Sequence, residues 1–547
     1  MYIATVPNRN SPPAILLRES YREGNKVSTK TLANLSHFSP ERIEALRLAL
    51  KGEFDHNISS FNQLTPQIGK TFGTYFALKC IADELGVTKA LGKDVYGILG
   101  LFLVLTRVAH RGSRLSAVRF AEHHAVTDIL GTPDFDEDDL YKALNYLHDQ
   151  QDAIELKLYQ EYLKKNGKPP ALVLYDVTSS YLEGEQNELA AYGYNWDGKR
   201  GKKQIVIGLL ADTEGDPLAV RVFEGNTADP STIAEQINIL KEKFGIEEII
   251  FVGDRGMVKT KAQEALNAET YHYITALTDA QVRTLLSEDI IQYGLFDTSV
   301  CEVENTGKRY ILKRNDLVRD KEEKRLQDKI EKLKALIQKR NEKVQNSKRA
   351  IPEKGLITLQ KWARQYRLHR FIDLTLEDRL IVYNLDQEAQ EESCLLDGCY
   401  VIVTDVAKNV LNTEQVHKAY RQLQSVERDF RTLKTGFLEV RPIFLRKKER
   451  TRAHVFVAML ALKIVRHLRE KLQSHELPWT VHDALDALSR YIFLSYEVEG
   501  IKTQVLPQPD EIQSKIFEAL GIKLPQKPPS LGKSKKENVG RRKNNRK

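Results

Sequence analysis

The sequence predicts an α/β core, a mixed sheet flanked by helices, with an α-rich region before it, a mixed β/α insertion within it and a helical C-terminal part after it. Two observations support this. Short apolar runs typical of buried strands cluster between about residues 170 and 280, and amphipathic helical periods dominate on either side. A chain of 547 residues is long enough for about two to four domains.

Before the core, the chain is expected to form a small β unit and then helices. Residues 14–32 flank a Glu-Gly-Asn turn with two apolar or alternating runs, which predicts a hairpin. A helix follows, with Ser39 as N-cap and Pro40 at its first position. Residues 71–164 have a helical pattern throughout. Their basic stretch TRVAHRGSRLSAVRFAEHH is compatible with a contact to DNA phosphates and equally with a solvated helix face.

The core begins where the periodicity changes. The apolar run ALVLYD ends in Asp176, residues 204–225 predict a hairpin around a Glu-Gly-Asp-Pro turn, and the run IIFVGD ends in Asp254. Helices are expected from Asp229 and at KTKAQEALNA, and a further strand at YHYITAL. The order strand, hairpin pair, helix, strand, helix, strand mixes antiparallel with parallel pairing, which is the layout of an RNase H-like core.

A long segment interrupts this core before the final helices. Within it, residues 284–314 look rich in strands, residues 320–344 carry apolar side chains at a/d-like spacing that seek an apolar partner, and residues 399–405 predict a strand. Helices are expected again from Thr413 to about Tyr496. The sequence thus divides into a β-hairpin region (1–38), a helical, DNA-binding region (39–168), the first part of the core (169–278), an insertion domain (279–412), core helices (413–500) and a basic tail (501–547).

The composition is that of an ordinary soluble protein, with 41% hydrophobic and 29% charged residues. No apolar run approaches the ~20 residues that span a bilayer, and the N-terminus lacks the pattern of an export signal. The four cysteines suit a reducing cytosol, and Cys394 and Cys399 lack a second pair for a zinc site. We therefore expect a cytoplasmic protein without a membrane partner.

One helix carries an unusual set of polar residues. In AYRQLQSVERDFRTLKTGF, residues 419–437, Tyr420, Glu427 and Lys434 recur at intervals of seven. At 100° per residue these three lie within roughly 40° of one another, on the flank of an apolar stripe. The stripe consists of Leu423, Val426, Phe430, Leu433 and Phe437. Taken alone, Glu427 is more simply explained as a partly buried surface carboxylate.

Two further carboxylates change that interpretation. Asp176 and Asp254 each end a predicted buried strand, where α/β sheets open their ligand crevice. Three converging carboxylates repel one another unless cations neutralise them, and hard oxygen ligands select Mg²⁺ or Mn²⁺. Two such ions about 4 Å apart can activate water and stabilise the leaving oxygen in phosphodiester cleavage. Together with Glu427, the aspartates therefore predict a two-metal site.

The chain resembles the DDE transposases of bacterial insertion sequences, in the IS-four clan with its Y-x2-R-x3-E-x6-K motif. Tyr420, Glu427 and Lys434 match three of the four motif positions, while Leu423 stands at the arginine position. The blocks YDVTSSYLEG, VFEGNTAD, VGDRGM, ESYREGNKV and ERTRAHVFVAMLALKI are also similar, so the resemblance covers nearly the whole chain.

The resemblance implies a function and a set of residue roles. It implies that Asp176, Asp254 and Glu427 bind two Mg²⁺ or Mn²⁺ ions and catalyse the cutting and rejoining of double-stranded DNA at the ends of the element. Tyr420 and Lys434 would hold the transposon end, and Arg421, Gln424 or Arg431 would replace the missing motif arginine. It further implies transposon-end and target DNA as partners, a homodimer on DNA and a bacterial cytoplasm.

A basic aromatic loop is a second candidate for DNA contact. The segment YNWDGKRGKKQ comes just before a core strand, and an aromatic side chain among cations suits gripping a strand end. A flexible solvated loop explains the composition equally well. The candidate DNA-binding residues are Trp196, Lys199, Arg200, Lys202 and Lys203.

Three other functions compete with this interpretation. A nuclease or an immobile DNA-binding relative would share the fold, and flanking inverted repeats would decide for a transposase. YDVTSS is also similar to aspartyl-phosphate phosphohydrolases, but Thr178 stands where those enzymes need a second aspartate. A helical DNA-packaging protein would explain the basic tail and leave the three carboxylates unexplained.

The tail leads to a first prediction. From Lys523 onward ten Lys and Arg stand against one acid, Glu537, so a net +9 lies in the tail of a chain whose total is +8. Deleting residues 531–547 should weaken binding to all DNA sequences alike and flatten the dependence of log K on log salt, because fewer counterions are released. Binding titrations across salt concentrations measure this, and an unchanged slope would show that the tail is a passive arm.

Overall fold

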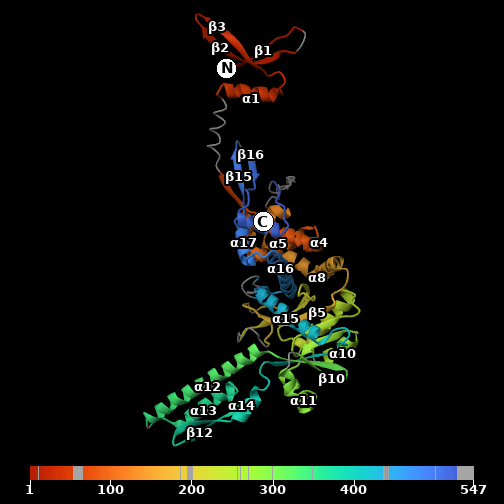
Figure 1. The fold of residues 1–547 in the computed structure, drawn as a ribbon, viewed down its shortest axis with the longest axis vertical. Coiled ribbons are helices and arrows are strands. Elements are labelled where there is room, and N and C mark those ends of the chain that lie inside the picture. Colours follow the sequence, from red (N-terminus) through yellow and green to blue (C-terminus); the bar gives the residue numbers. More distant parts are fainter. Residues whose placement is uncertain are drawn as a thin grey trace, which may run out of the picture.

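The structure is a computed structural model with a main body, a small N-terminal unit set apart from it and an insertion that projects from its other end (Figure 1). The described residues are 1–9, 12–52, 66–184, 186–193, 201–255, 257–258, 260–268, 270–297, 300–347, 349–434, 438, 440, 443–498 and 501–526. The tail beyond residue 526, with the segment named in the first prediction, lies outside them.

The centre of the body is an eight-stranded mixed sheet in the order β10-β11-β14-β9-β8-β5-β6-β7. β5 pairs in parallel with β8 and β8 with β9, while the remaining neighbours are antiparallel. The strands are β5 (Leu172–Tyr181), β6 (Gln204–Ala211), β7 (Pro217–Glu224), β8 (Ile250–Gly253), β9 (His272–Ala276), β10 (Cys301–Asn305), β11 (Lys308–Arg314) and β14 (Cys399–Thr404).

This topology confirms the RNase H-like prediction. A hairpin, β6 and β7, lies on one side of β5, and two parallel strands reached through helices, β8 and β9, lie on the other. The prediction that residues 284–314 are rich in strands is correct only for β10 and β11, because α11 ends at Ser287 and η3 covers Tyr293–Asp297. These two strands and the strand predicted at 399–405 extend the same sheet through β14, which pairs with β9. Sequence patterns located these strands without indicating that they join the core sheet.

Helices cover both faces of the sheet. One face packs on α15 (Thr413–Lys434) and α16 (Lys448–Ser474), and Leu174 and Val252 belong to this core. The other face carries Val173 and Phe251 and packs on a second core. That second core includes side chains from α9 (Ile233–Asn238), η2 (Ile239–Lys243), α10 (Thr260–Ala268) and α11 (Asp279–Ser287). Along the chain, η1 (Asp229–Thr232) comes directly before α9, and η3 (Tyr293–Asp297) follows α11.

The insertion leaves the sheet after β11 and returns at β14. Its long helix α12 (Asp316–Gln345) buries Ile330, Leu333 and Ile337 against a core of its own, so the predicted apolar partner exists. The remaining elements of the insertion are α13 (Pro352–Gln365), η4 (Leu368–Arg370), β12 (Ile372–Glu377), β13 (Leu380–Leu385) and α14 (Gln387–Cys394).

The helical part between the N-terminal unit and the core packs around α16, nearly all of whose central residues are buried. It comprises α3 (Gly73–Glu84), α4 (Val87–Leu91), α5 (Val95–Ala109), α6 (Arg114–His123), α7 (Val126–Leu130), α8 (Glu137–Asn166), α17 (Val481–Ser489) and α18 (Glu511–Ala519). Within the described residues, no helix combines the length and apolar character that crossing a membrane requires.

The C-terminal end of this part corrects one prediction. Helical structure was expected to about Tyr496, but β15 (Ile492–Val498) and β16 (Ile501–Val505) are strands. β15 pairs with β4 (Pro66–Thr71), more than 400 residues earlier in the chain. Such a distant partner leaves no trace in local periodicity, although the aromatic and β-branched side chains of IFLSYEV favour a strand.

The N-terminal unit is a three-stranded antiparallel sheet with one helix. It contains β1 (Tyr2–Val6), β2 (Ala14–Glu23), β3 (Lys26–Asn34) and α1 (Pro40–Leu50). β2 and β3 form the predicted hairpin, and β1 adds a third strand beside β2.

Candidate catalytic site

Two aspartates occupy neighbouring positions on the central parallel strands. Tyr175 of β5 pairs with Gly253 of β8, so Asp176 and Asp254 follow at the next position of each chain segment. The sheet therefore brings the two carboxylates side by side although 78 residues separate them in the sequence.

Both aspartates lie on the face of the sheet that α15 covers. Side chains alternate between faces along a strand, and Leu174 and Val252, two residues before each aspartate, pack in the α15 core. Asp176 Oδ1 accepts a hydrogen bond of 2.8 Å from the backbone N–H of Val177. Asp254 follows the last residue of its strand, as predicted.

The prediction that Asp176 ends a strand is wrong. β5 continues to Tyr181, because residues 177–181 pair with the hairpin strand β6 after the pairing with β8 has stopped. The continuous apolar run stops at Asp176, and after Val177 the residues Thr178, Ser179 and Ser180 are polar. The prediction took this change in polarity for the end of the strand.

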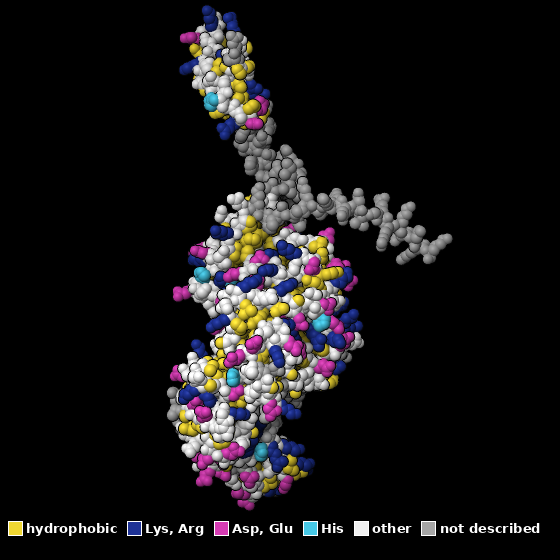
Figure 2. Space-filling model, turned by 90° about the vertical axis from the view of Figure 1, so that its right-hand side faces the viewer, with side chains coloured by type: hydrophobic (Ala, Val, Ile, Leu, Met, Phe, Trp, Pro, Cys, Tyr) yellow, Lys and Arg dark blue, Asp and Glu magenta, His cyan; other side chains and the backbone are white. Residues whose placement is uncertain are grey.

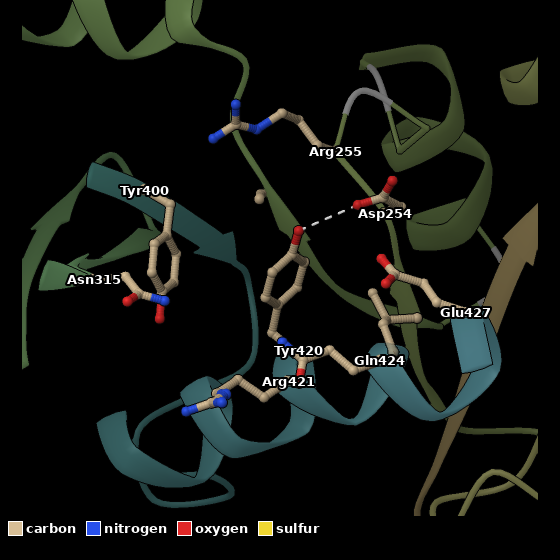
Figure 3. Close-up of a pocket in the computed structure, with 10 residues that line it drawn as sticks. Asp254, Arg255, Asn315, Tyr400, Tyr420, Arg421, Gln424 and Glu427 are labelled. Atoms are coloured by element: carbon tan, nitrogen blue, oxygen red, sulfur yellow. Dashed lines mark hydrogen bonds between the residues drawn. The ribbon is translucent and has the colours of Figure 1, made fainter. Parts of the chain in front are cut away.

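Helix α15 brings the third carboxylate over this face. It begins at Thr413, as expected, and its described part ends at Lys434. Asn412 caps it, since Asn412 Oδ1 accepts a hydrogen bond from the N–H of Gln415. Its buried side chains form the predicted apolar stripe of Leu423, Val426, Phe430 and Leu433, while Phe437 lies outside the described residues. Tyr420 and Glu427 stand beside the stripe and point toward Asp254 (Figure 3).

A pocket of about 290 Å³ opens between α15 and the ends of β8 and β14. Across it, the hydroxyl of Tyr420 donates to Asp254 Oδ1 over 3.3 Å (Figure 3). Its described lining residues are Asp254, Arg255, Ala276, Asn315, Tyr400, Tyr420, Arg421, Leu423, Gln424 and Glu427. The pocket thus combines two carboxylates and two tyrosines with two guanidinium groups.

The charges in this pocket influence one another. Partial burial and the nearby Asp254 carboxylate raise the pKa of Glu427, and Arg431 opposes this shift. Burial and Asp254 likewise raise the pKa of Tyr420, which keeps its hydroxyl a neutral donor. Burial is the larger cause of the raised pKa of Glu427, and repulsion between the Asp254 and Glu427 carboxylates adds to it.

The carboxylate oxygens of the three residues are of a type that binds divalent cations, but they do not already surround a common metal position. Among the described residues, no three His, Cys, Asp or Glu side chains already form a cluster that could hold a metal ion. Asp254 and Glu427 share the pocket, and Asp176 lies at the neighbouring strand position. Three carboxylates on one face are the hard oxygen donors that Mg²⁺ and Mn²⁺ prefer.

An ion pair behind the pocket holds α15 in place. Asp429, fully buried, lies 2.7 Å from an Nη of Arg466 on α16, whose side chain is 8% exposed. The other Nη of Arg466 donates to the backbone carbonyl of Glu214 in the turn between β6 and β7. Burial raises the pKa of Asp429 to about 6, and Arg466 opposes the shift. Helix α15, helix α16 and the hairpin are therefore tied at one point, two residues from Glu427.

The other predicted residues are divided between two places. Arg431 and Lys434 lie on α15 beyond Glu427, and Arg431 is close enough to oppose the rise in the pKa of Glu427. Lys202 pairs with Glu183 at 3.1 Å, and neither Lys202 nor Lys203 lines the pocket. Trp196, Lys199 and Arg200 lie outside the described residues.

The sequence analysis missed two residues that line the pocket, one cationic and one aromatic. Arg255 follows Asp254 directly and faces the pocket, and Tyr400 of β14 donates to or accepts from His417 Nε2 at 2.6 Å beside it. The block VGDRGM contains Arg255, so its position next to an aspartate was the available signal. Leu423, at the motif's arginine position, is buried, while its neighbours Arg421 and Gln424 reach the pocket.

An RNase H-like sheet with carboxylates on its central strands and on a helix across the same face defines the class of enzymes that cut or transfer nucleic-acid strands. Residues 167–464 match the model of the transposase DDE domain, and residues 3–60 match that of the N-terminal domain of IS1634 family transposases. The chain belongs to the DDE transposase family of insertion sequences. Its activity is metal-dependent cleavage and rejoining of DNA, and members of this family generally use divalent metal ions.

Solved transposase structures are also similar to this chain. The piggyBac transposase synaptic complex with hairpin DNA shares 9% identity and a TM-score of 0.33 over 76% of each chain. The Mos1 transposase paired-end complex with the left transposon end shares 11% identity and a TM-score of 0.15, over 30% of this chain and 58% of that one. The comparison with curated proteins found no match.

Proposed function

We propose that Asp176, Asp254 and Glu427 are the carboxylates with which this transposase cuts DNA. The observation that carries the proposal is the facing of Asp254 and Glu427 across one pocket, on the side of the sheet where Asp176 occupies the adjacent strand position. The matched DDE domain, residues 167–464, contains all three. The fold thus supports a triad drawn from β5, β8 and α15.

The three carboxylates would hold two Mg²⁺ or Mn²⁺ ions. Such a pair of ions supplies an activated water and stabilises the leaving oxygen of a phosphodiester. The protein contributes the position of the donors: β5 and β8 fix the aspartates through their pairing, and α15 carries Glu427 on an apolar stripe that cannot rotate without exposing its core. Tyr420 orients Asp254 through its hydroxyl.

The cations around the pocket suit a DNA phosphate. Arg255 and Arg421 line it on the side away from Glu427 (Figure 3). A guanidinium can hold a phosphate through two parallel hydrogen bonds, so either residue can take the part of the arginine that Leu423 replaces. Arg431 and Lys434 would extend the contact along the DNA.

The substrates we propose are the double-stranded ends of the element and its target DNA, in a bacterial cell. After hydrolysis frees a 3′-hydroxyl at the element's end, that hydroxyl attacks a target phosphodiester, the bond to the target's own 3′-oxygen breaks, and the element's end becomes joined to the target's 5′-phosphate. A homodimer would hold both ends together. The helical region 39–168, the loop around Lys202 and the insertion 279–412 would contribute to DNA binding, in the six-part division proposed from the sequence.

Metal-directed cleavage of the polypeptide tests the proposed site without relying on enzymatic activity. Fe²⁺ bound in place of Mg²⁺ generates hydroxyl radicals with ascorbate and peroxide, which cut the backbone near the ligands. Cuts near residues 176, 254 and 427, suppressed by added Mg²⁺, are expected. Cuts elsewhere, or cuts that Glu427→Gln leaves unchanged at all three positions, would contradict the triad.

Lys434 gives a prediction that separates DNA positioning from chemistry. It lies two helical turns from Glu427 on α15, so its ammonium is expected to reach a phosphate near the metals rather than the metals themselves. Lys434→Ala should weaken binding to the element's end more than binding to scrambled DNA, and slow cleavage should persist. Lys434→Arg should restore only part of the loss. Band shifts and cleavage on matched duplexes measure both effects, and wild-type behaviour of Lys434→Ala on both would make the seven-residue spacing a coincidence.

A further inference from the structure

The hairpin of the N-terminal unit has two faces of different chemistry. Cross-strand partners share a face, and the pairs Arg18–Thr31, Ser20–Thr29 and Arg22–Val27 alternate with the pairs Glu19–Lys30, Tyr21–Ser28 and Glu23–Lys26. The first set, here called the arginine face, has two cations, three hydroxyls and no acid. The second set, the mixed-charge face, balances two cations with two acids.

The outer part of the arginine face is open to solvent, whereas the Nε atom of Arg18, at the inner end of the face, is buried. Ser20, Arg22, Thr29 and Thr31 are exposed, and Arg18 is half-buried. Helix α1 approaches from the other side, because Arg47 donates to Thr5 Oγ1 and Thr5 shares its face with Ile15, not with Arg18. Among the described residues, the exposure of Ser20, Arg22 and Thr29 shows that the outer part of the arginine face is uncovered.

The unit carries a positive charge that most of the chain lacks. Residues 1–52 contain eight Lys and Arg against four Asp and Glu, whereas residues 1–522 as a whole sum to −1. The unit also lies at one extremity of the molecule, well away from the pocket on α15 (Figure 1), and Lys and Arg side chains are visible around its surface (Figure 2). A polyanion is the partner that this charge favours.

We propose that the arginine face enters the major groove of DNA and reads bases there. The outer part of the hairpin, from Glu19 to Lys30, extends beyond β1 and is two-stranded, and such a ribbon fits the major groove, which is about 12 Å wide. Arg18 lies at the base of this ribbon, where Tyr2 of β1 pairs with it. Arg18 and Arg22 lie four residues apart on one face, roughly 13 Å along the strand, which spans about four base pairs. Their planar guanidinium groups match the two acceptors of guanine, and the hydroxyls of Ser20, Thr29 and Thr31 can contact base edges or phosphates.

Two double variants of equal charge test this inference in the full-length protein. Arg18→Ala with Arg22→Ala removes two cations from the arginine face, and Lys26→Ala with Lys30→Ala removes two from the opposite face of the same ribbon. The probes are a duplex from the inverted repeats that flank the coding region and a scrambled duplex of equal composition.

The arginine variant should bind the repeat duplex about tenfold weaker or more for each guanidinium lost, and the scrambled duplex only slightly weaker. The lysine variant should weaken binding to both duplexes equally and modestly. A third variant, Arg18→Lys with Arg22→Lys, keeps the charge and guards against misfolding: it should recover binding to scrambled DNA but not to the repeat.

Three results would overturn the proposal. If the arginine and lysine variants lost equal affinity for the repeat duplex, the loss would be explained by net charge alone. Unchanged repeat binding by the arginine variant would leave the face without a role in DNA recognition. A change in sedimentation without a change in DNA affinity would assign the face to contact between copies of the chain. The triad variants do not enter this test, so its failure would leave the catalytic proposal intact.

Discussion

Asp254→Asn is expected to reduce DNA cleavage to the detection limit while DNA binding stays near that of the wild type. The substitution keeps the shape of the side chain and its acceptor for the Tyr420 hydroxyl, but it removes the charge that would hold a metal ion. Losing several kcal/mol of metal-dependent transition-state stabilisation corresponds to roughly a 10³-fold loss in rate or more. Asp176→Asn and Glu427→Gln should have the same effect.

Cleavage of a labelled duplex from the element's end, with band shifts on the same duplex, measures both quantities. Glu449→Gln is a matched control, because Glu449 is an acidic residue on α16 that does not line the pocket. It should cleave like the wild type. Cleavage near the wild-type rate by any of the three triad variants would remove that residue from the proposed triad.

Breaking the ion pair between Asp429 and Arg466 is expected to destabilise the protein more than any surface change. Arg466→Met leaves the fully buried carboxylate of Asp429 without its cation, which costs roughly 3–5 kcal/mol in such pairs. The same variant should slow cleavage, because α15 carries Glu427 two residues from the break. Thermal unfolding and cleavage rates measure the two effects.

The double variant Asp429→Leu with Arg466→Met distinguishes the pair from simple packing. Without any buried charge, its stability should return toward that of the wild type. The exposed pair Glu511–Lys515 is the control, since Lys515→Met should change the free energy of unfolding by less than about 1 kcal/mol. A double variant as unstable as Arg466→Met would show that the loss comes from packing and not from charge.

The order of the core elements was predictable because each is marked locally. The first part of β5, before Asp176, and the whole of β8 are continuous apolar runs. The β6–β7 hairpin has a turn rich in Gly, Asp and Pro, and α15 has a clear apolar stripe. The position of Glu427 on the flank of that stripe followed from the 100° rotation per residue alone.

The remaining features depend on partners that are distant in sequence. β15 is a strand because β4 lies beside it, and β5 runs past Asp176 because β6 does. Arg255 and Tyr400 reach one pocket only because β14 closes onto β9, and the pairing of Asp429 with Arg466 spans 37 residues and two helices. Neither periodicity nor motif spacing encodes such pairings.

The way the insertion is attached has an evolutionary consequence. The chain leaves the sheet at Arg314 and returns at Cys399, and these two residues are partners across the β11–β14 ladder. The helices and the small sheet between them have their own apolar core, so the excursion starts and ends at one point of the scaffold. A domain inserted between two adjacent strand ends can be lengthened, shortened or exchanged between lineages while β5, β8 and α15 keep their geometry. The insertion and the catalytic core can therefore have different evolutionary histories.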